Sequence, residues 1–278
     1  MSAIIIFIIS GCLTQDYALP PMQIENPDIL LTVLYQSPNA AVVPAVINRQ
    51  GPFRCMIDSG SRGSVVSPSV ADQLAPKERM DDEYLEGDRV SIRSWSVSGV
   101  AFIDFTAIVS DPGDVDCILG ANALVDLVVG WRPTAGTLYL NADPLIDDGS
   151  SRIAIELSGG RPFISAVIGG RQTNAVLLAP GLPQSRILRG LADALGAADG
   201  ATAVETTVSV NNEPARSLAC PIIDEPATGL FHRTPDIVLG GDAFKDRLVI
   251  IDFPNASAYI ILAPLDTGFI ASPPASDR

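Results

Sequence analysis

The sequence is poor in the residues that build metal centres and nucleophilic triads. Its 278 residues include one histidine and four cysteines. No spacing among them matches a metal-binding pattern, so we expect no metal and no other cofactor. The histidine, His232, has no serine or cysteine signature to act with, and we interpret it as a loop residue.

Positive charge is also scarce. Lys77 and Lys245 are the only lysines, and the formal net charge is −14 at pH 7 with a pI near 4.3. A nucleic-acid surface needs clustered cations to contact phosphates, so we do not expect nucleic acid as a partner. Hydrophobic residues make up 47% of the chain, which indicates a globular protein rather than a disordered one.

Long apolar runs are missing too. The N-terminal run from Ala3 to Ile9 is too short to span a bilayer and has the length of a signal-peptide core. It ends in Ile9-Ser10-Gly11-Cys12, which resembles a bacterial lipobox. This resemblance implies cleavage before Cys12, a lipid on its thiol and a periplasmic position on the outer membrane, with plain secretion as the alternative.

The most informative stretch is residues 53–68, where an apolar run ends in Asp58-Ser59-Gly60-Ser61 and a second β-branched run follows. This pattern predicts a strand, a sharp turn that carries a carboxylate, and another strand. A buried, unpaired carboxylate is costly, so Asp58 should lie at a cleft or find hydrogen-bond donors. Gly60 supplies a permissive backbone, and the hydroxyls of Ser59 and Ser61 can brace the acid.

A second motif, Ile118-Leu119-Gly120, ends an apolar strand in the same half of the chain. Together with the Asp58 turn it resembles the pepsin/retropepsin aspartic peptidases, over about residues 29–262. In that family the Ile-Leu-Gly strand lies beside the turn that bears the acid. Two such lobes face each other across a cleft, each with one catalytic Asp.

The first half of the chain is repeated in the second half, about 120 residues later. Residues 166–168 repeat 45–47, residues 176–181 repeat 55–60, and residues 237–240 repeat the Ile-Leu-Gly strand. We therefore predict an all-β fold of two pseudo-symmetric pepsin/retropepsin-like lobes with a cleft between them.

The expected boundaries follow from this repeat. Residues 127–131 and 137–140 are predicted to close the first lobe, and Tyr84 lies where the family keeps its flap. We divide the chain into a lipoprotein-type signal segment (1–12), a tether (13–28), the first lobe (29–140), a linker (141–149), the second lobe (150–262) and a proline-rich tail (263–278).

The second lobe lacks its acid. Ala179 stands where the family has the second Asp, Pro180 replaces the hydroxyl residue that braces the lobes, and Gly181 is retained. The family's chemistry needs two carboxylates that share a proton. Without that partner, Asp58 is expected to titrate as an ordinary acid.

Two other acids could be mistaken for the missing one. Asp266-Thr267-Gly268 lies too close to the C-terminus for a Leu-Gly strand to follow it, so we interpret it as a turn. Asp242 follows two glycines and is expected to cap a short helix.

The resemblance also bears on the cysteines. Cys55 precedes Asp58 by three residues and Cys117 precedes Ile118, so the family fold puts them on neighbouring strands. A disulfide and two buried thiols both remain open, and Cys220 is expected to be an unpaired thiol in the core.

Three functions remain open. One is aspartic-type peptide-bond hydrolysis centred on Asp58, with the second carboxylate supplied by another chain. Another is an inactive envelope lipoprotein of the same fold that binds a peptide or protein in the interlobe cleft. The third is a purely structural envelope protein, which leaves the intact Asp58 turn unexplained.

Overall fold

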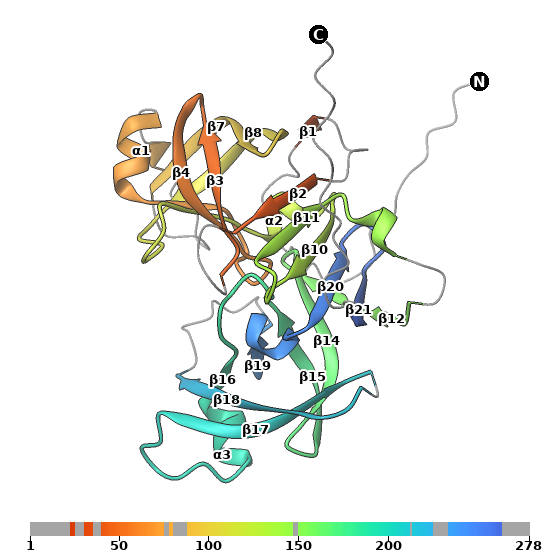
Figure 1. The fold of residues 1–278 in the computed structure, drawn as a ribbon. Coiled ribbons are helices and arrows are strands. Elements are labelled where there is room, and N and C mark those ends of the chain that lie inside the picture. Colours follow the sequence, from red (N-terminus) through yellow and green to blue (C-terminus); the bar gives the residue numbers. More distant parts are fainter. Residues whose placement is uncertain are drawn as a thin grey trace, which may run out of the picture.

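The computed structural model describes residues 23–25, 31–35, 40–74, 78–79, 88–146, 150–211, 213–224 and 233–262. Within them the chain forms three β-sheets of eight, six and seven strands (Figure 1). Several predicted features lie outside the described residues: Cys12, Tyr84, His232 and Asp266-Thr267-Gly268.

The first lobe is a closed barrel. Strand β8 pairs with both β5 and β7, which closes a ring of six strands. Its strands are β3 (Val42–Ile47), β4 (Gln50–Ile57), β5 (Val65–Val66), β7 (Asp88–Val97), β8 (Val100–Val109) and β9 (Cys117–Leu119). Two short strands extend this sheet, β1 (Gln23–Glu25) and β6 (Glu78–Arg79), and β1 lies within the predicted tether.

The second lobe repeats the first. Its barrel strands are β14 (Arg161–Ile168), β15 (Arg171–Leu178), β16 (Arg186–Leu188), β17 (Ala203–Val210), β18 (Arg216–Ile223) and β19 (Ile237–Leu239), with β13 (Glu156–Ser158) added at the edge. The parallel pairs β4–β9 and β5–β8 recur as β15–β19 and β16–β18. The prediction of two pseudo-symmetric all-β lobes is confirmed.

The third sheet joins the two halves of the chain. In order its strands are β12 (Arg152–Ala154), β21 (Ser257–Leu262), β20 (Arg247–Asp252), β10 (Val128–Arg132), β11 (Thr137–Leu140) and β2 (Leu31–Leu34). The prediction that β10 and β11 close the first lobe is wrong, because β10 pairs with β11 and with β20. In Figure 1 β10, β11 and β20 lie between the two lobes.

Helices are short and sit at strand ends. They are α1 (Pro68–Leu74), α2 (Ala121–Leu124), α3 (Arg189–Ala194) and the 3₁₀ turns η1 (Asp143–Leu145) and η2 (Gly241–Phe244). The N-terminal end of α1 is held by Ser67, whose hydroxyl accepts the Val70 N–H at 3.3 Å. No helix in the described residues is long and apolar enough to cross a membrane.

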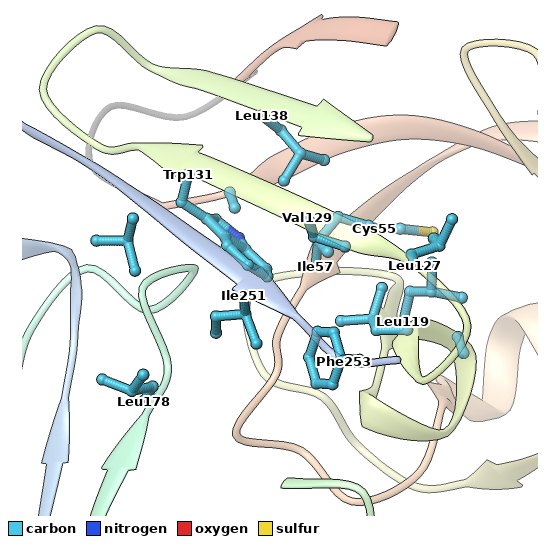
Figure 2. Packing of buried hydrophobic residues seen from close by; sticks show 14 of the residues in the cluster. Cys55, Ile57, Leu119, Leu127, Val129, Trp131, Leu138, Leu178, Ile251 and Phe253 are labelled. Carbon is cyan, nitrogen blue, oxygen red and sulfur yellow. The ribbon is translucent and has the colours of Figure 1, made fainter. Parts of the chain in front are cut away.

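One hydrophobic core runs from the barrels into the third sheet. Trp131 in β10 and Phe253, which directly follows β20, are both buried. Figure 2 shows them with Ile57 and Leu119, the last residues of β4 and β9. The strand end that leads into Asp58 therefore rests on packing that both halves contribute.

Candidate active site

Asp58 follows the last residue of β4 and begins a tight turn. Its backbone N–H donates to the Leu119 carbonyl at 3.1 Å, and its own carbonyl accepts the Ser61 N–H at 3.2 Å. The Gly60 N–H donates to Asp58 Oδ1 at 2.8 Å. Only 6% of the Asp58 residue is exposed, so the turn holds its carboxyl group almost fully out of solvent.

The serine hydroxyls of this turn have roles other than the predicted one. Ser59 Oγ donates to the Leu178 carbonyl of the second lobe at 2.8 Å, and Ser61 Oγ donates to the Gly63 carbonyl at 2.9 Å. The prediction that these hydroxyls brace the Asp58 carboxyl group is wrong. Backbone amides supply the donors, because the turn directs successive N–H groups at the acid.

The turn at Ala179 reproduces this backbone in the second lobe. Its N–H donates to the Leu239 carbonyl at 3.0 Å, and its carbonyl accepts the Leu182 N–H at 2.9 Å. Leu239 ends β19 as Leu119 ends β9. Ala179 therefore holds the same position in its lobe as Asp58 holds in the first lobe, with a buried methyl group in place of a carboxyl group.

The two turns pack directly against each other. A Cβ atom added to Gly60 would lie 2.9 Å from the Ala179 Cβ, and one added to Gly181 would lie 2.0 Å from the Ile57 carbonyl oxygen. The Ala41 N–H also donates to the Gly181 carbonyl across the lobe boundary at 3.0 Å. Both glycines are needed because any side chain would collide with the opposite lobe.

Burial changes the chemistry of Asp58. Loss of hydration raises the pKa of its carboxyl group from 3.8 to about 6. The Gly60 and Ser61 amides and the charges of Arg186 and Arg161 oppose this rise without cancelling it. The prediction that Asp58 titrates as an ordinary acid is wrong, because it considered only the missing carboxylate and not the burial.

Residues 43–123 match a family model described as aspartyl protease. The matched segment begins in β3, contains the Asp58 turn and β9, and ends in α2, so it spans the first barrel. The match supports an aspartic-peptidase-like function for the chain. A comparison with curated proteins finds no match.

A buried serine, Ser64, stabilises the Asp58 turn of this aspartyl-protease-like lobe through hydrogen bonds to two residues that follow β9. Ser64 Oγ accepts the Gly120 N–H at 3.2 Å and donates to Asn122 Oδ1 at 3.0 Å. Neither Ser64 nor Asn122 stands out in the local sequence pattern. The internal repeat does indicate both residues, because Ser185 and Asp242 occupy the matching positions of the second lobe.

Asp242 binds Ser185 in this matching pair and does not cap a helix. Its Oδ1 accepts both the Ser185 N–H at 2.7 Å and the Ser185 hydroxyl at 2.6 Å. The 3₁₀ turn η2 begins at Gly241, and no side chain caps it. The prediction that Asp242 caps a helix is therefore wrong.

Two arginines of the second lobe act electrostatically on the Asp58 carboxyl group. Arg186 is exposed, and its charge acts on the Asp58 carboxyl group. Arg161 and Arg233 both stack on the ring of Phe163, with guanidinium carbons 5.4 and 4.8 Å from its centre. Phe163 packs in one apolar cluster with Ala179. The charges that act on the Asp58 carboxyl group are therefore those of two cations, Arg186 and Arg161.

A disulfide fastens the strand that leads to Asp58. Cys55 in β4 and Cys117 in β9 are directly paired and joined, with 4.5 Å between their Cα atoms. Cys220 is a free buried thiol, as expected. No cluster of potential metal ligands occurs in the residues described.

Proposed function

We propose that this protein, which has an aspartic-peptidase-like fold, binds peptide or protein segments and does not cleave them. The observation that carries this proposal is the packing of the Asp58 turn against the Ala179 turn. The position related to Asp58 by the repeat holds a buried methyl group. Ala179 is, in this proposal, the degenerate equivalent of the family's second catalytic Asp.

Amide hydrolysis in this family uses one carboxylate as a base towards water and one carboxylic acid towards the substrate carbonyl. Asp58 can take only one of these states at a time. The charges that act on it come from Arg186 and Arg161, so no described carboxylate shares its proton. A single buried acid suits hydrogen bonding to a ligand better than peptide-bond cleavage.

Hydrolysis with a carboxylate from another chain has a steric difficulty. The face of the Asp58 turn that a partner would approach is covered by the second lobe, through the Ser59 to Leu178 and Ala41 to Gly181 hydrogen bonds. A partner would have to displace these buried contacts. We therefore favour the binding function over this alternative.

We propose that the ligand lies between the lobes, where the family resemblance implies a cleft, and that Asp58 is its hydrogen-bonding group. The proposal includes a lipid anchor on Cys12 and a position in the cell envelope, facing the periplasm. A lipid anchor would hold the protein at the membrane, so its ligands would be segments of other envelope proteins. Mass spectrometry of the mature N-terminus tests the anchor, and an unmodified Cys12 would contradict it.

The first test compares wild type with Asp58→Asn, both produced from Leu13 onward. A mixed peptide library is incubated with each between about pH 3 and 7, and cleavage and retention on the immobilised protein are measured. We expect retention of some peptides and cleavage of none. Cleavage by wild type that disappears in Asp58→Asn would overturn the proposal.

The second test restores the missing groups with Ala179→Asp and Pro180→Ser together. If the absent carboxylate alone prevents catalysis, the double variant should cleave the library at acid pH as a monomer. Pro180→Ser alone is the matched control, because it returns the hydroxyl without the acid. Cleavage by this control would show that the acid at position 179 is not what is missing.

A further inference from the structure

Strand β18 has one edge that is only partly paired. It pairs with β17 from Arg216 to Pro221, but with β16 only at Ile222 and Ile223. Between Arg216 and Pro221 the second edge has no strand beside it in the described parts of the chain. An open edge of this kind presents backbone donors and acceptors to which another chain can pair.

The direction of the backbone groups on this edge follows from the ladder. The Ile222 N–H donates to the Thr202 carbonyl at 2.9 Å, so alternate residues from Ile222 face β17. Ser217, Ala219 and Pro221 therefore face away from β17. Pro221 lacks an N–H, which costs nothing on an unpaired edge. Among the described residues, the Ala219 carbonyl accepts a long bond of 3.4 Å from Gln184 Nε2.

A hollow of about 890 Å³ lies along this edge. Its volume is in the range of ligand sites. One wall is β18 itself, and the opposite wall comes from the β10–β11 turn, the loop after Ala179 and the end of η2. These walls contribute Ser217 and Ala219 on one side and Thr134, Gln184 and Lys245 on the other.

In the first lobe, the corresponding edge of β8 is paired with an added strand. Strand β1 pairs antiparallel with β8, the counterpart of β18, with Gln23 to Glu25 opposite Ile103 to Ala101. It lies on the edge that β8 also offers to β5. No described segment takes this place in the second lobe. Matched through the β5–β8 and β16–β18 pairs, residues 101–103 correspond to residues 215–217, so β1 covers the start of the edge that is open on β18.

Charge indicates what the added strand carries. Lys245 is exposed at the hollow, and the Arg216 guanidinium is held there by a 2.8 Å bond to the Lys245 carbonyl. Of the two acids in the lining, Asp242 is bound to Ser185 and only Asp246 is exposed. An acidic side chain on the ligand would complement the two cations.

We propose that the open edge of β18 and the adjoining hollow bind an extended segment of a partner protein, which adds as an antiparallel strand and places an acidic side chain near Lys245 and Arg216. Backbone hydrogen bonds to Ser217 and Ala219 supply the affinity. This site is distinct from the Asp58 turn and does not depend on the function proposed for that turn.

The test uses the mixed peptide library on immobilised wild type, Ala219→Pro and Ala219→Val. We expect wild type to enrich peptides with an acidic residue, and Ala219→Pro to weaken the best of them at least tenfold. Pro removes the N–H that faces away from β17, as Pro221 already does two residues later, so the barrel should tolerate it. Ala219→Val keeps the N–H and should bind like wild type.

Hydrogen exchange on the wild-type protein gives an independent measurement. The best peptide should slow exchange at the Ser217 and Ala219 amides, and this requires no variant to fold. Binding unchanged by Ala219→Pro, unchanged exchange at both amides, or no enriched peptide would each overturn the proposal. Asp58→Asn should leave this binding intact, which separates it from binding at the Asp58 turn.

Discussion

The Ser59 hydroxyl donates a buried hydrogen bond of 2.8 Å to the carbonyl of Leu178. This bond ties the Asp58 turn of one lobe to the end of β15 in the other. Pro180, which matches Ser59 in the repeat, has no hydroxyl to return the bond. At these two matched positions the turns are therefore joined by one side-chain bond instead of a symmetric pair.

Ser59→Ala should lower the free energy of unfolding by about 1–3 kcal/mol, because it leaves the buried Leu178 carbonyl without its donor. Urea unfolding of the variant and wild type measures the change. Ser61→Ala is the matched control, since Ser61 is partly exposed and its bond to Gly63 is local. Equal losses in both variants would contradict a special role for the bond between lobes.

Gly181→Ala should be among the most damaging single substitutions, with a loss of about 4 kcal/mol or more. The added Cβ would lie 2.0 Å from the Ile57 carbonyl oxygen, which is backbone and cannot move away cheaply. Gly190→Ala is the control, because nothing lies within 4 Å of its added Cβ in α3. Thermal melting should place Gly190→Ala at or slightly above wild type.

Asp58→Asn should stabilise the protein at neutral pH. The folded-state pKa of about 6 lies above the ordinary 3.8, so the folded state binds the proton more tightly. The stabilisation that this bound proton gives the folded state is fully present below about pH 4. It is lost as the pH rises through 6, which lowers the free energy of unfolding by an amount on the order of 3 kcal/mol. Asn remains uncharged and avoids the loss.

The measurement is urea unfolding of wild type and Asp58→Asn at pH 4 and pH 7.5. The two proteins should be close in stability at pH 4, and the variant should be more stable at pH 7.5. Substitution of the exposed Asp199 by Asn serves as the control. A difference of the same size at both pH values would show that burial of the charge is not the cause.

Arg186→Gln should raise the pKa of Asp58 above about 6, because the arginine charge favours the ionised carboxyl group. A ¹³C NMR titration of the labelled Asp58 carboxyl group measures the shift directly. Arg93→Gln, an exposed change in β7, is the control and should leave the titration unchanged. A pKa that falls in Arg186→Gln would contradict this electrostatic role.

Reduction of the Cys55–Cys117 disulfide should cost about 2–4 kcal/mol, because the bond closes a loop with a sequence separation of 62. Guanidinium unfolding with and without a phosphine reductant measures the loss. Cys220→Ala should respond to the reductant as wild type does, since Cys220 is a free thiol. No effect of the reductant would contradict the pairing.

The sequence predicted the barrels well because their signals are local. The apolar run before Asp58, the turn residues after it and the repeat at residues 176–181 each describe a strand end. The same signals mispredicted β10 and β11. Their alternation is compatible with either a barrel or a separate sheet, and only pairing with β20 decides between them.

By itself the sequence determined that one turn carries an acid and that its repeat carries Ala179. Only the tertiary structure decided that Asp58 is nearly buried, that Ser59 bonds across the lobes and that Arg186 acts on the carboxyl group. These properties depend on contacts between residues far apart in the chain. Neither hydrophobic periodicity nor turn composition records such contacts, because both describe only neighbours in sequence.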